Sequence, residues 1–294
     1  MLKTLYFLAP ILYAAANLAD KILVTGDDED TDPGALLALS GLFAGVFAIF
    51  FGLYIVYTGR PLGDIADIMM LTAVGAIYYS AIWIYLAMLK EDETSNVTAW
   101  FQVIPLFGIL GAFLVLGEAP TALQVIAVPL IVIGGFMLSY QKGKTNKTIV
   151  FWMIVSAGLV ALYDISFAQY GRNIDEFSAI FFMLLGKTIT GFVFLAIDKK
   201  AQRGFMIGVR TRIKTQFVSE SVNTLADISL YASLLFYPVL LVQGISALQP
   251  MCVLIGAIIL GRWYPQVKED AEGTSLHWKL ISLVLMIAGG IFLS

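Results

Sequence analysis

Long apolar stretches, each about the length that crosses a lipid bilayer, occupy most of this chain. A transmembrane helix needs about 20 mostly apolar residues, and ten windows of that kind can be placed along the sequence. They cover residues 4–24, 34–58, 66–89, 96–116, 120–140, 148–170, 177–197, 214–236, 238–261 and 277–294. Polar turns separate them, the longest at residues 198–214, and no soluble domain fits between them. The sequence therefore predicts an all-α polytopic membrane protein with ten transmembrane helices.

The composition agrees with this prediction and excludes several function classes. The 294 residues are 59% hydrophobic and 13% charged, whereas about a quarter of the residues of a soluble domain are charged. Cys252 is the one cysteine and His277 the one histidine, so neither a disulfide framework nor a histidine-based metal site is expected. A net charge of −3 argues against nucleic acid as a partner. We expect a multi-pass protein of the cell membrane, embedded in the lipid bilayer, without a cofactor or a metal.

The two halves of the chain resemble each other. The segment PLFGILGAFLVLGE, which begins at Pro105, aligns with PMCVLIGAIILGR, which begins at Pro250. The apolar stretches that follow contain GGFMLS and GGIFLS in corresponding places. We interpret residues 1–140 and 148–294 as two five-helix repeats. Five spans return the chain to the opposite side of the membrane, so the second repeat should be inverted, an arrangement common in carriers that work by alternating access.

On these features the chain resembles the drug/metabolite transporter superfamily, and within it the EamA-like ten-helix transporters. The shared features are two five-helix halves, fourth and ninth spans with Pro and Gly that end in LGE or LGR, and following spans with a GG pair. One departure is YAAANLADK in the first span, where many relatives have a Trp-Gly pair and a later Lys. The resemblance implies a carrier of amino acids, amines, nucleotide sugars or similar metabolites. It also implies a central cavity lined mainly by spans one, three, four, six, eight and nine.

Ionisable side chains within apolar spans are the first candidates for function. An ionised group at the centre of a span costs about 3 kcal/mol on insertion scales, so each should face a partner or water. Asp164 lies in the sixth span, Lys187 in the seventh, and Glu220 and Asp227 in the eighth. We expect Lys187 to pair with one of these acids, either in coupling or as a structural ion pair. Up to two acids then remain for a cationic group or a proton.

Polar and aromatic side chains extend this set. In the first span, Tyr13, Asn17 and Asp20 share one helical face, and Asp20 is close enough to the end to be an interfacial charge. Rings near carboxylates suit an amine through cation–π attraction, although packing or an interface belt explains any single ring as well. We expect substrate binding by Asn17, Tyr78, Tyr79, Trp83, Gln102, Asp164, Asn223, Asp227, Tyr231 and Gln249, with Lys187 and Glu220 as coupling or ion-pair residues.

Pro105 and Pro250 occupy matched places in the fourth and ninth spans. Proline removes a backbone donor and frees carbonyl groups within a helix. Those carbonyls, together with Gln102, Gln243 and Gln249, can contact a substrate. We favour a role of the two prolines in bending or gating, and kinks that are satisfied locally are the alternative.

These features predict a secondary transporter, not an enzyme. It moves a small organic metabolite, such as an amine or an amino acid, by alternating access through a central cavity, with protons or a counter-substrate as candidates for coupling. The alternatives are a quaternary ammonium or drug exporter of the same fold, an intramembrane enzyme and a channel.

The orientation in the membrane stays open on the sequence. Of the 18 basic residues, Lys187 lies within a span, Lys3, Arg60 and Arg172 lie on the side of the termini, and the other 14 lie opposite. The positive-inside rule therefore favours termini outside the cytoplasm, whereas the resemblance implies termini inside it.

Overall fold

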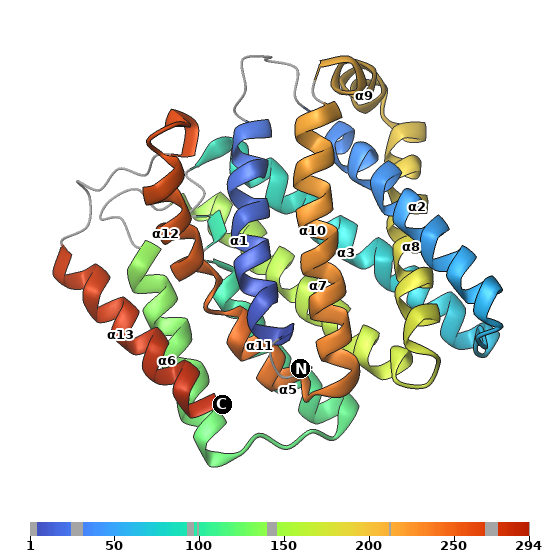
Figure 1. Cartoon of the computed structure of the whole chain (residues 1–294). Helices are drawn as coiled ribbons and strands as arrows, with labels where there is room; N and C mark the ends of the chain where they lie inside the picture. The colour runs from blue at the N-terminus through green and yellow to red at the C-terminus, as the bar shows by residue number, and fades with distance from the viewer. Residues whose placement is uncertain are drawn as a thin grey trace.

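The computed structural model of the protein describes residues 5–24, 32–92, 97–98, 100–139, 146–211, 213–267 and 276–293. Within these ranges the regular structure is helical throughout, without a strand, and the helices pack side by side as a bundle (Figure 1). The longer helices are α1 (Leu5–Val24), α2 (Pro33–Thr58), α3 (Ile65–Glu91), α6 (Ala122–Ser139), α7 (Lys147–Gly171), α8 (Glu176–Ile197), α10 (Ile213–Phe236) and α13 (Leu276–Leu293). The shorter ones are η2 (Trp100–Val103), α5 (Ile104–Gly111), η3 (Ala112–Leu116), α9 (Lys199–Thr211), α11 (Val239–Ser246), α12 (Gln249–Leu260) and η4 (Pro265–Val267).

The helix bounds follow the apolar stretches of the sequence closely. The fourth stretch is filled by η2, α5 and η3 in succession, and the ninth by α11 and α12. Among the described residues, five segments are long and apolar enough to cross a membrane, namely α2, α3, α7, α8 and the α11–α12 pair. Trp100–Leu116 and Ala122–Met137 are shorter apolar helices. The all-helical prediction is confirmed, and the number of ten crossings remains a prediction.

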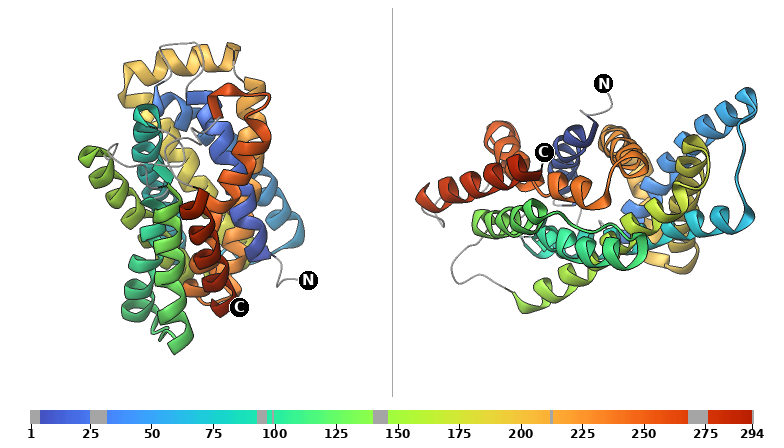
Figure 2. Two further views of the ribbon diagram at one scale, coloured as in Figure 1. Left: turned by 90° about the vertical axis from the view of Figure 1, so that its left-hand side faces the viewer. Right: turned by 90° about the horizontal axis from the view of Figure 1, so that it is seen from below.

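The expectation of a polar turn at residues 198–214 is wrong, because α9 occupies most of it. The side chain of Asp198 accepts a hydrogen bond from the backbone N–H of Lys200 at 2.8 Å, which satisfies one of the free donors at the start of the helix. The buried residues Ala201 and Gly208 recur at a helical spacing. In Figure 2, α9 lies across one end of the bundle, opposite the two termini.

Pro105 and Pro250 begin helical segments. Pro105 lies in the first turn of α5, directly after the 3-10 turn of η2. Pro250 lies in the first turn of α12, after α11 has ended at Ser246. A proline in the first turn lacks only an N–H that would have no partner within the helix. A proline bend inside one continuous helix is therefore not seen at either position. In the first half the 3-10 turn η2 passes into α5 at Pro105, and in the second half the chain breaks between α11 and α12 just before Pro250.

Helices of the two halves pack against each other in a regular pattern. The main neighbours are α1 with α10, α3 with α7, α2 with α8, and α6 with α13. Glycines allow close approach where α8 crosses its neighbours: a Cβ placed on Gly186 would lie 2.0 Å from the carbonyl oxygen of Thr72. On Gly41 a Cβ would lie 3.1 Å from the Cα of Gly191. Because the backbones nearly touch, α8 is held firmly against α2 and α3.

Candidate functional site

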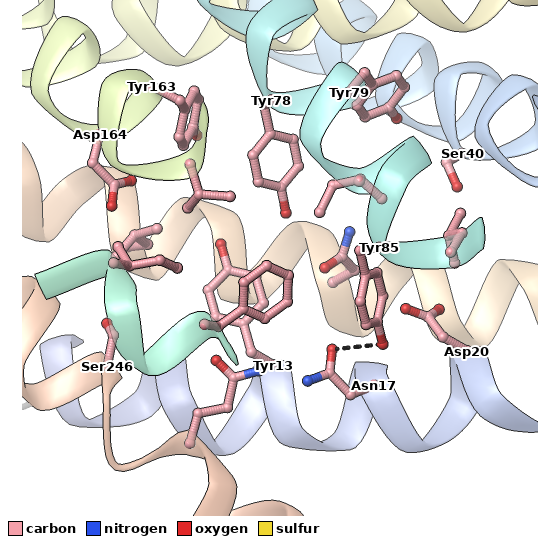
Figure 3. A pocket seen from close by; sticks show the side chains of 18 of the residues that line it. Tyr13, Asn17, Asp20, Ser40, Tyr78, Tyr79, Tyr85, Tyr163, Asp164 and Ser246 are labelled. Atoms are coloured by element: carbon pink, nitrogen blue, oxygen red, sulfur yellow. Dashed lines mark hydrogen bonds between the residues drawn. The ribbon is translucent and has the colours of Figure 1, made fainter. Parts of the chain in front are cut away.

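A cavity lies at the centre of the bundle, between helices that are distant in sequence. Its walls come from α1, α2, α3, η2, α5, α7, α10, α11 and the start of α12. These are the spans that the resemblance implied, with α2 in addition. In Figure 3, Asp164 and Ser246 lie toward one end of the cavity, Asp20 and Ser40 lie toward the other, and Tyr78 lies between them.

Lys187 is neutralised beside this cavity and not within it. The side chain is 1% exposed, and its Nζ donates to a carboxylate oxygen of Asp227, one of the partners expected from the sequence. The other carboxylate oxygen of Asp227 accepts a hydrogen bond from the Tyr13 hydroxyl at 2.6 Å. The Lys187 ammonium also lies 3.9 Å from the ring centroid of Tyr78 and 5.3 Å from that of Tyr231. Neither Lys187 nor Asp227 lines the cavity.

At the end near α2 and α10, a second acidic group is held by hydrogen bonds without a cation. Glu220 accepts from the Ser40 hydroxyl at 2.5 Å and from the Gln216 amide at 3.1 Å. Asp20 accepts from the Ser219 hydroxyl at 3.3 Å. Both acids line the cavity, Asp20 from near the end of α1.

Asp164 occupies the opposite end, on α7. It is 3% exposed, and its Oδ2 accepts from the side-chain amide of Gln243 at 3.0 Å. Its Oδ1 has no hydrogen-bond partner among the described residues. Neither Asp164, Glu220 nor Asp20 forms an ion pair with a described lysine or arginine. The cavity therefore carries carboxyl groups at both ends, and the nearest buried cation is already paired.

Buried polar atoms without a partner gather around this cavity. They are Asn17 Nδ2, Gln102 Oε1, Tyr163 OH, Asp164 Oδ1, Gln216 Oε1, Tyr231 OH, Gln243 Oε1 and Ser246 Oγ among the described residues. All of these residues except Tyr231 line the cavity. An unmet buried donor or acceptor costs about 1–3 kcal/mol, and such groups usually bind water or a ligand. Their convergence on one space makes this cavity the candidate binding site for a polar molecule.

The expected site residues divide into two groups. Asn17, Tyr78, Tyr79, Gln102, Asp164, Asn223 and Gln249 line the cavity, as do Glu220 and Pro105. Trp83, Lys187, Asp227, Tyr231 and Pro250 do not line it. Trp83 is 42% exposed and stacks on Phe194, with ring centroids 6.4 Å apart. Tyr231 is buried against Tyr163 and Phe167 behind the cavity wall.

Several lining residues were missed on the sequence. Gln216 had a usable signal, since it precedes Glu220 by one helical turn and shares its face. Tyr85 had a comparable signal, since it follows Tyr78 by seven residues and shares its face. Ser40, Tyr163 and Ser246 had none, because a single hydroxyl within an apolar span does not reveal which helix it faces.

The comparisons with known proteins address the fold and the family. Residues 4–140 match the model of the EamA-like transporter family. Over this segment, slightly less than half of the chain, the sequence is similar to that family. Its members are membrane transporters of the drug/metabolite kind, in agreement with the resemblance noted on the sequence.

A solved structure shares the fold of this chain over nearly its whole length. This structure, named only "Crystal structure of protein", aligns with a TM-score of 0.67 at 14% identity, over 99% of this chain and 95% of its own. At this identity the likeness concerns the fold alone. No curated protein matches the sequence.

Proposed function

We propose that the protein is a secondary transporter of the cell membrane that carries a small organic amine through the central cavity by alternating access. The observation that carries this proposal is the charge of the cavity. Asp164 and Glu220 line it without a paired cation, whereas Lys187 is already neutralised by Asp227. Burying an uncompensated carboxylate is costly, so a cationic ligand or a proton at these groups would stabilise the protein.

The unmet polar atoms favour an amine that has N–H groups. Near Asp164, the free acceptors are Asp164 Oδ1 and Gln243 Oε1, with Ser246 Oγ also unpartnered. A primary ammonium offers three N–H donors to such a set, whereas a quaternary ammonium offers none. The alternative of a quaternary ammonium exporter is therefore the less favoured one.

At the other end of the cavity, the unmet atoms include a donor. Asn17 Nδ2 lacks a partner, while Asn17 Oδ1 accepts from the Tyr85 hydroxyl at 3.4 Å. An amide donor suits a carboxylate or hydroxyl oxygen. This supports a metabolite with an acceptor at one end and an amine at the other, of which an amino acid is one example.

Aromatic rings between the two ends suit the same ligand. Tyr79, Tyr85 and Tyr163 line the cavity with Tyr78. The position of Lys187 Nζ at 3.9 Å from the Tyr78 centroid illustrates how an ammonium is accommodated over a ring here, by attraction to the electron-rich face.

The packing of the two halves supports ten spans arranged as inverted repeats, residues 1–140 and 148–294. In the first repeat, α1, α2, α3 and α6 are the first, second, third and fifth spans, and in the second repeat α7, α8, α10 and α13 are the corresponding ones. When each helix is exchanged for its counterpart, the contact of α1 with α10 becomes that of α7 with α3. The contacts of α2 with α8 and of α6 with α13 map onto themselves. An arrangement with this symmetry can exchange an outward-open state for an inward-open one by rocking of one half against the other.

The first test is ligand-dependent thermal stability of the purified chain in detergent. We would screen phenethylamine, its trimethylammonium analogue, phenylalanine and a sugar phosphate against the parent protein and Asp164→Asn. A ligand at 100 times its Kd adds about 2.7 kcal/mol of stability. We expect saturable stabilisation by the primary amine or the amino acid, which is lost in Asp164→Asn and kept in the exposed control Asp64→Asn. Stabilisation by the sugar phosphate alone, unchanged in Asp164→Asn, would contradict the proposal.

Transport in proteoliposomes separates a carrier from a channel or an enzyme. We expect uptake of the stabilising amine to saturate and to be accelerated by the same amine trapped inside, without chemical conversion. An imposed pH gradient then distinguishes coupling to protons from exchange with a counter-substrate.

A further inference from the structure

Helix α9 has one face that packs on the bundle. Ala201 is fully buried, and Gly208 is buried seven residues later on the same side. A Cβ placed on Gly208 would lie 2.7 Å from Leu39 Cδ1, and one placed on Gly34 would lie 3.2 Å from the Cβ of Ala201. The helix is therefore fixed against the first turns of α2.

The opposite face of α9 is basic. Lys199, Lys200, Arg203 and Arg210 are all exposed, and no acidic residue occurs within the helix. None of these four forms an ion pair with an acidic residue in the part of the chain that the structure describes. At a helical spacing of about 100° per residue, Lys199, Arg203 and Arg210 lie opposite Ala201 and Gly208, and Lys200 lies on one flank.

Exposed apolar side chains adjoin the basic face. Met206 is 55% exposed, Ile207 38% and Val209 36%. By the same helical spacing, Val209 lies on the flank between the buried face and the basic face, whereas Met206 lies at the edge of the basic face, about 20° from Lys199. A helix exposed to water alone has no need of an apolar flank, whereas one at a membrane surface buries that flank among the acyl chains and keeps its cations at the headgroups.

The position of α9 agrees with such a surface. It follows α8 with one intervening residue and is followed by α10, and it contacts α2 where that apolar helix begins. It lies across the end of the bundle opposite the termini (Figures 1 and 2). In a ten-span arrangement, 14 of the 18 basic residues lie at this end, which the positive-inside rule assigns to the cytoplasm.

We propose that α9 is an interfacial helix that binds the headgroups of anionic phospholipids through Lys199, Lys200, Arg203 and Arg210. Val209 enters the acyl region beside α2, while Met206 lies beside the cations at the level of the headgroups. Charge complementarity identifies the ligand, since each basic side chain at an anionic bilayer surface contributes about 1 kcal/mol, which is about a fivefold enrichment. A zwitterionic headgroup carries no net charge for these cations to select.

The test places a fluorescent bimane at Met206→Cys in a Cys252→Ala background of the full chain. The protein is reconstituted into phosphatidylcholine bilayers in which one fifth of the lipid is phosphatidylglycerol. Bromine, which quenches bimane on contact, is carried by the phosphatidylglycerol in one sample and by an equal amount of phosphatidylcholine in the other. The matched control carries bimane at Val56→Cys, which is 81% exposed at the far end of α2.

We expect brominated phosphatidylglycerol to quench the Met206 probe about fivefold more strongly than brominated phosphatidylcholine. The preference should fall to that of the Val56 probe when Lys199, Lys200, Arg203 and Arg210 are replaced by Gln. An unchanged Val56 signal in that variant shows that it still inserts and folds.

Equal quenching by the two lipids at Met206, or a preference that survives the Gln replacements, would overturn the proposal. Absence of quenching by either lipid would place α9 in water and would also overturn it.

Discussion

The pair of Lys187 and Asp227 allows a quantitative test of how a charge is kept inside the bundle. Lys187 is 1% exposed and Asp227 2%, and the carboxylate receives the ammonium on one oxygen and the Tyr13 hydroxyl on the other. Removing one member of such a buried pair leaves an uncompensated charge and costs about 3–5 kcal/mol. We therefore expect Lys187→Met and Asp227→Asn each to lower the free energy of unfolding by about that amount.

The double variant is the decisive measurement. Lys187→Met with Asp227→Asn carries neither charge, and the Asn side chain still offers an oxygen to the Tyr13 hydroxyl. We expect the double variant to be more stable than either single variant, because replacing both members of a buried ion pair is often nearly neutral. Thermal unfolding in detergent can follow this, since about 3–5 kcal/mol corresponds to a shift on the order of 10 °C.

An exposed lysine at the start of α7 provides the control for these variants. Lys147→Met removes an exposed lysine at the start of α7 and should change the unfolding temperature little. If the losses of the two single variants add up in the double variant, the two residues act independently and the ion-pair argument fails. If Asp227→Asn abolishes amine-induced stabilisation while the fold stays intact, Asp227 contacts the substrate and belongs to the binding site.

Two glycines give further predictions that the same assays check. A Cβ on Gly108 would lie 1.4 Å from Gln243 Oε1, so Gly108→Ala should displace the amide that donates to Asp164 and weaken stabilisation by amines at least tenfold in apparent affinity. A Cβ on Gly186 would meet the carbonyl oxygen of Thr72 at 2.0 Å, so Gly186→Ala should separate α3 from α8 and cost about 1–3 kcal/mol in thermal unfolding. Gly158→Ala serves as the control for both, because its nearest atoms lie 3.7 Å away; a loss there as large as at Gly186 would disprove the steric argument.

The sequence was sufficient to predict the helices because each apolar stretch is long and is bounded by polar residues. It also predicted that Lys187 must have an acidic partner, since an isolated ammonium in a span is too costly. It did not decide among the acids, because the choice depends on how α7, α8 and α10 are rotated about their axes. Only packing determines that rotation.

Two misplaced expectations have simple geometric causes. Tyr78 and Tyr85 are seven residues apart, so they share a face of α3, whereas Trp83 lies about 140° away from Tyr78 at 100° per residue and points out of the cavity wall. Helix α9 was missed because its high content of basic residues resembles a polar turn. Its buried residues recur at a helical spacing, and that periodicity was the better guide.

The charge distribution of α8 and α10 has a consequence for how the chain enters the membrane during synthesis. Lys187 and Asp227 lie on α8 and α10, which are separated in the chain by α9. Helix α10, which also carries Glu220, is not among the segments apolar enough to cross unaided. If α10 crosses, it therefore needs a neighbour already in place, and α8 offers the counter-charge at the required depth. We expect the insertion machinery to release these two helices into lipid as a unit, and insertion of α10 to be less efficient when Lys187 alone is replaced and Asp227 keeps its charge.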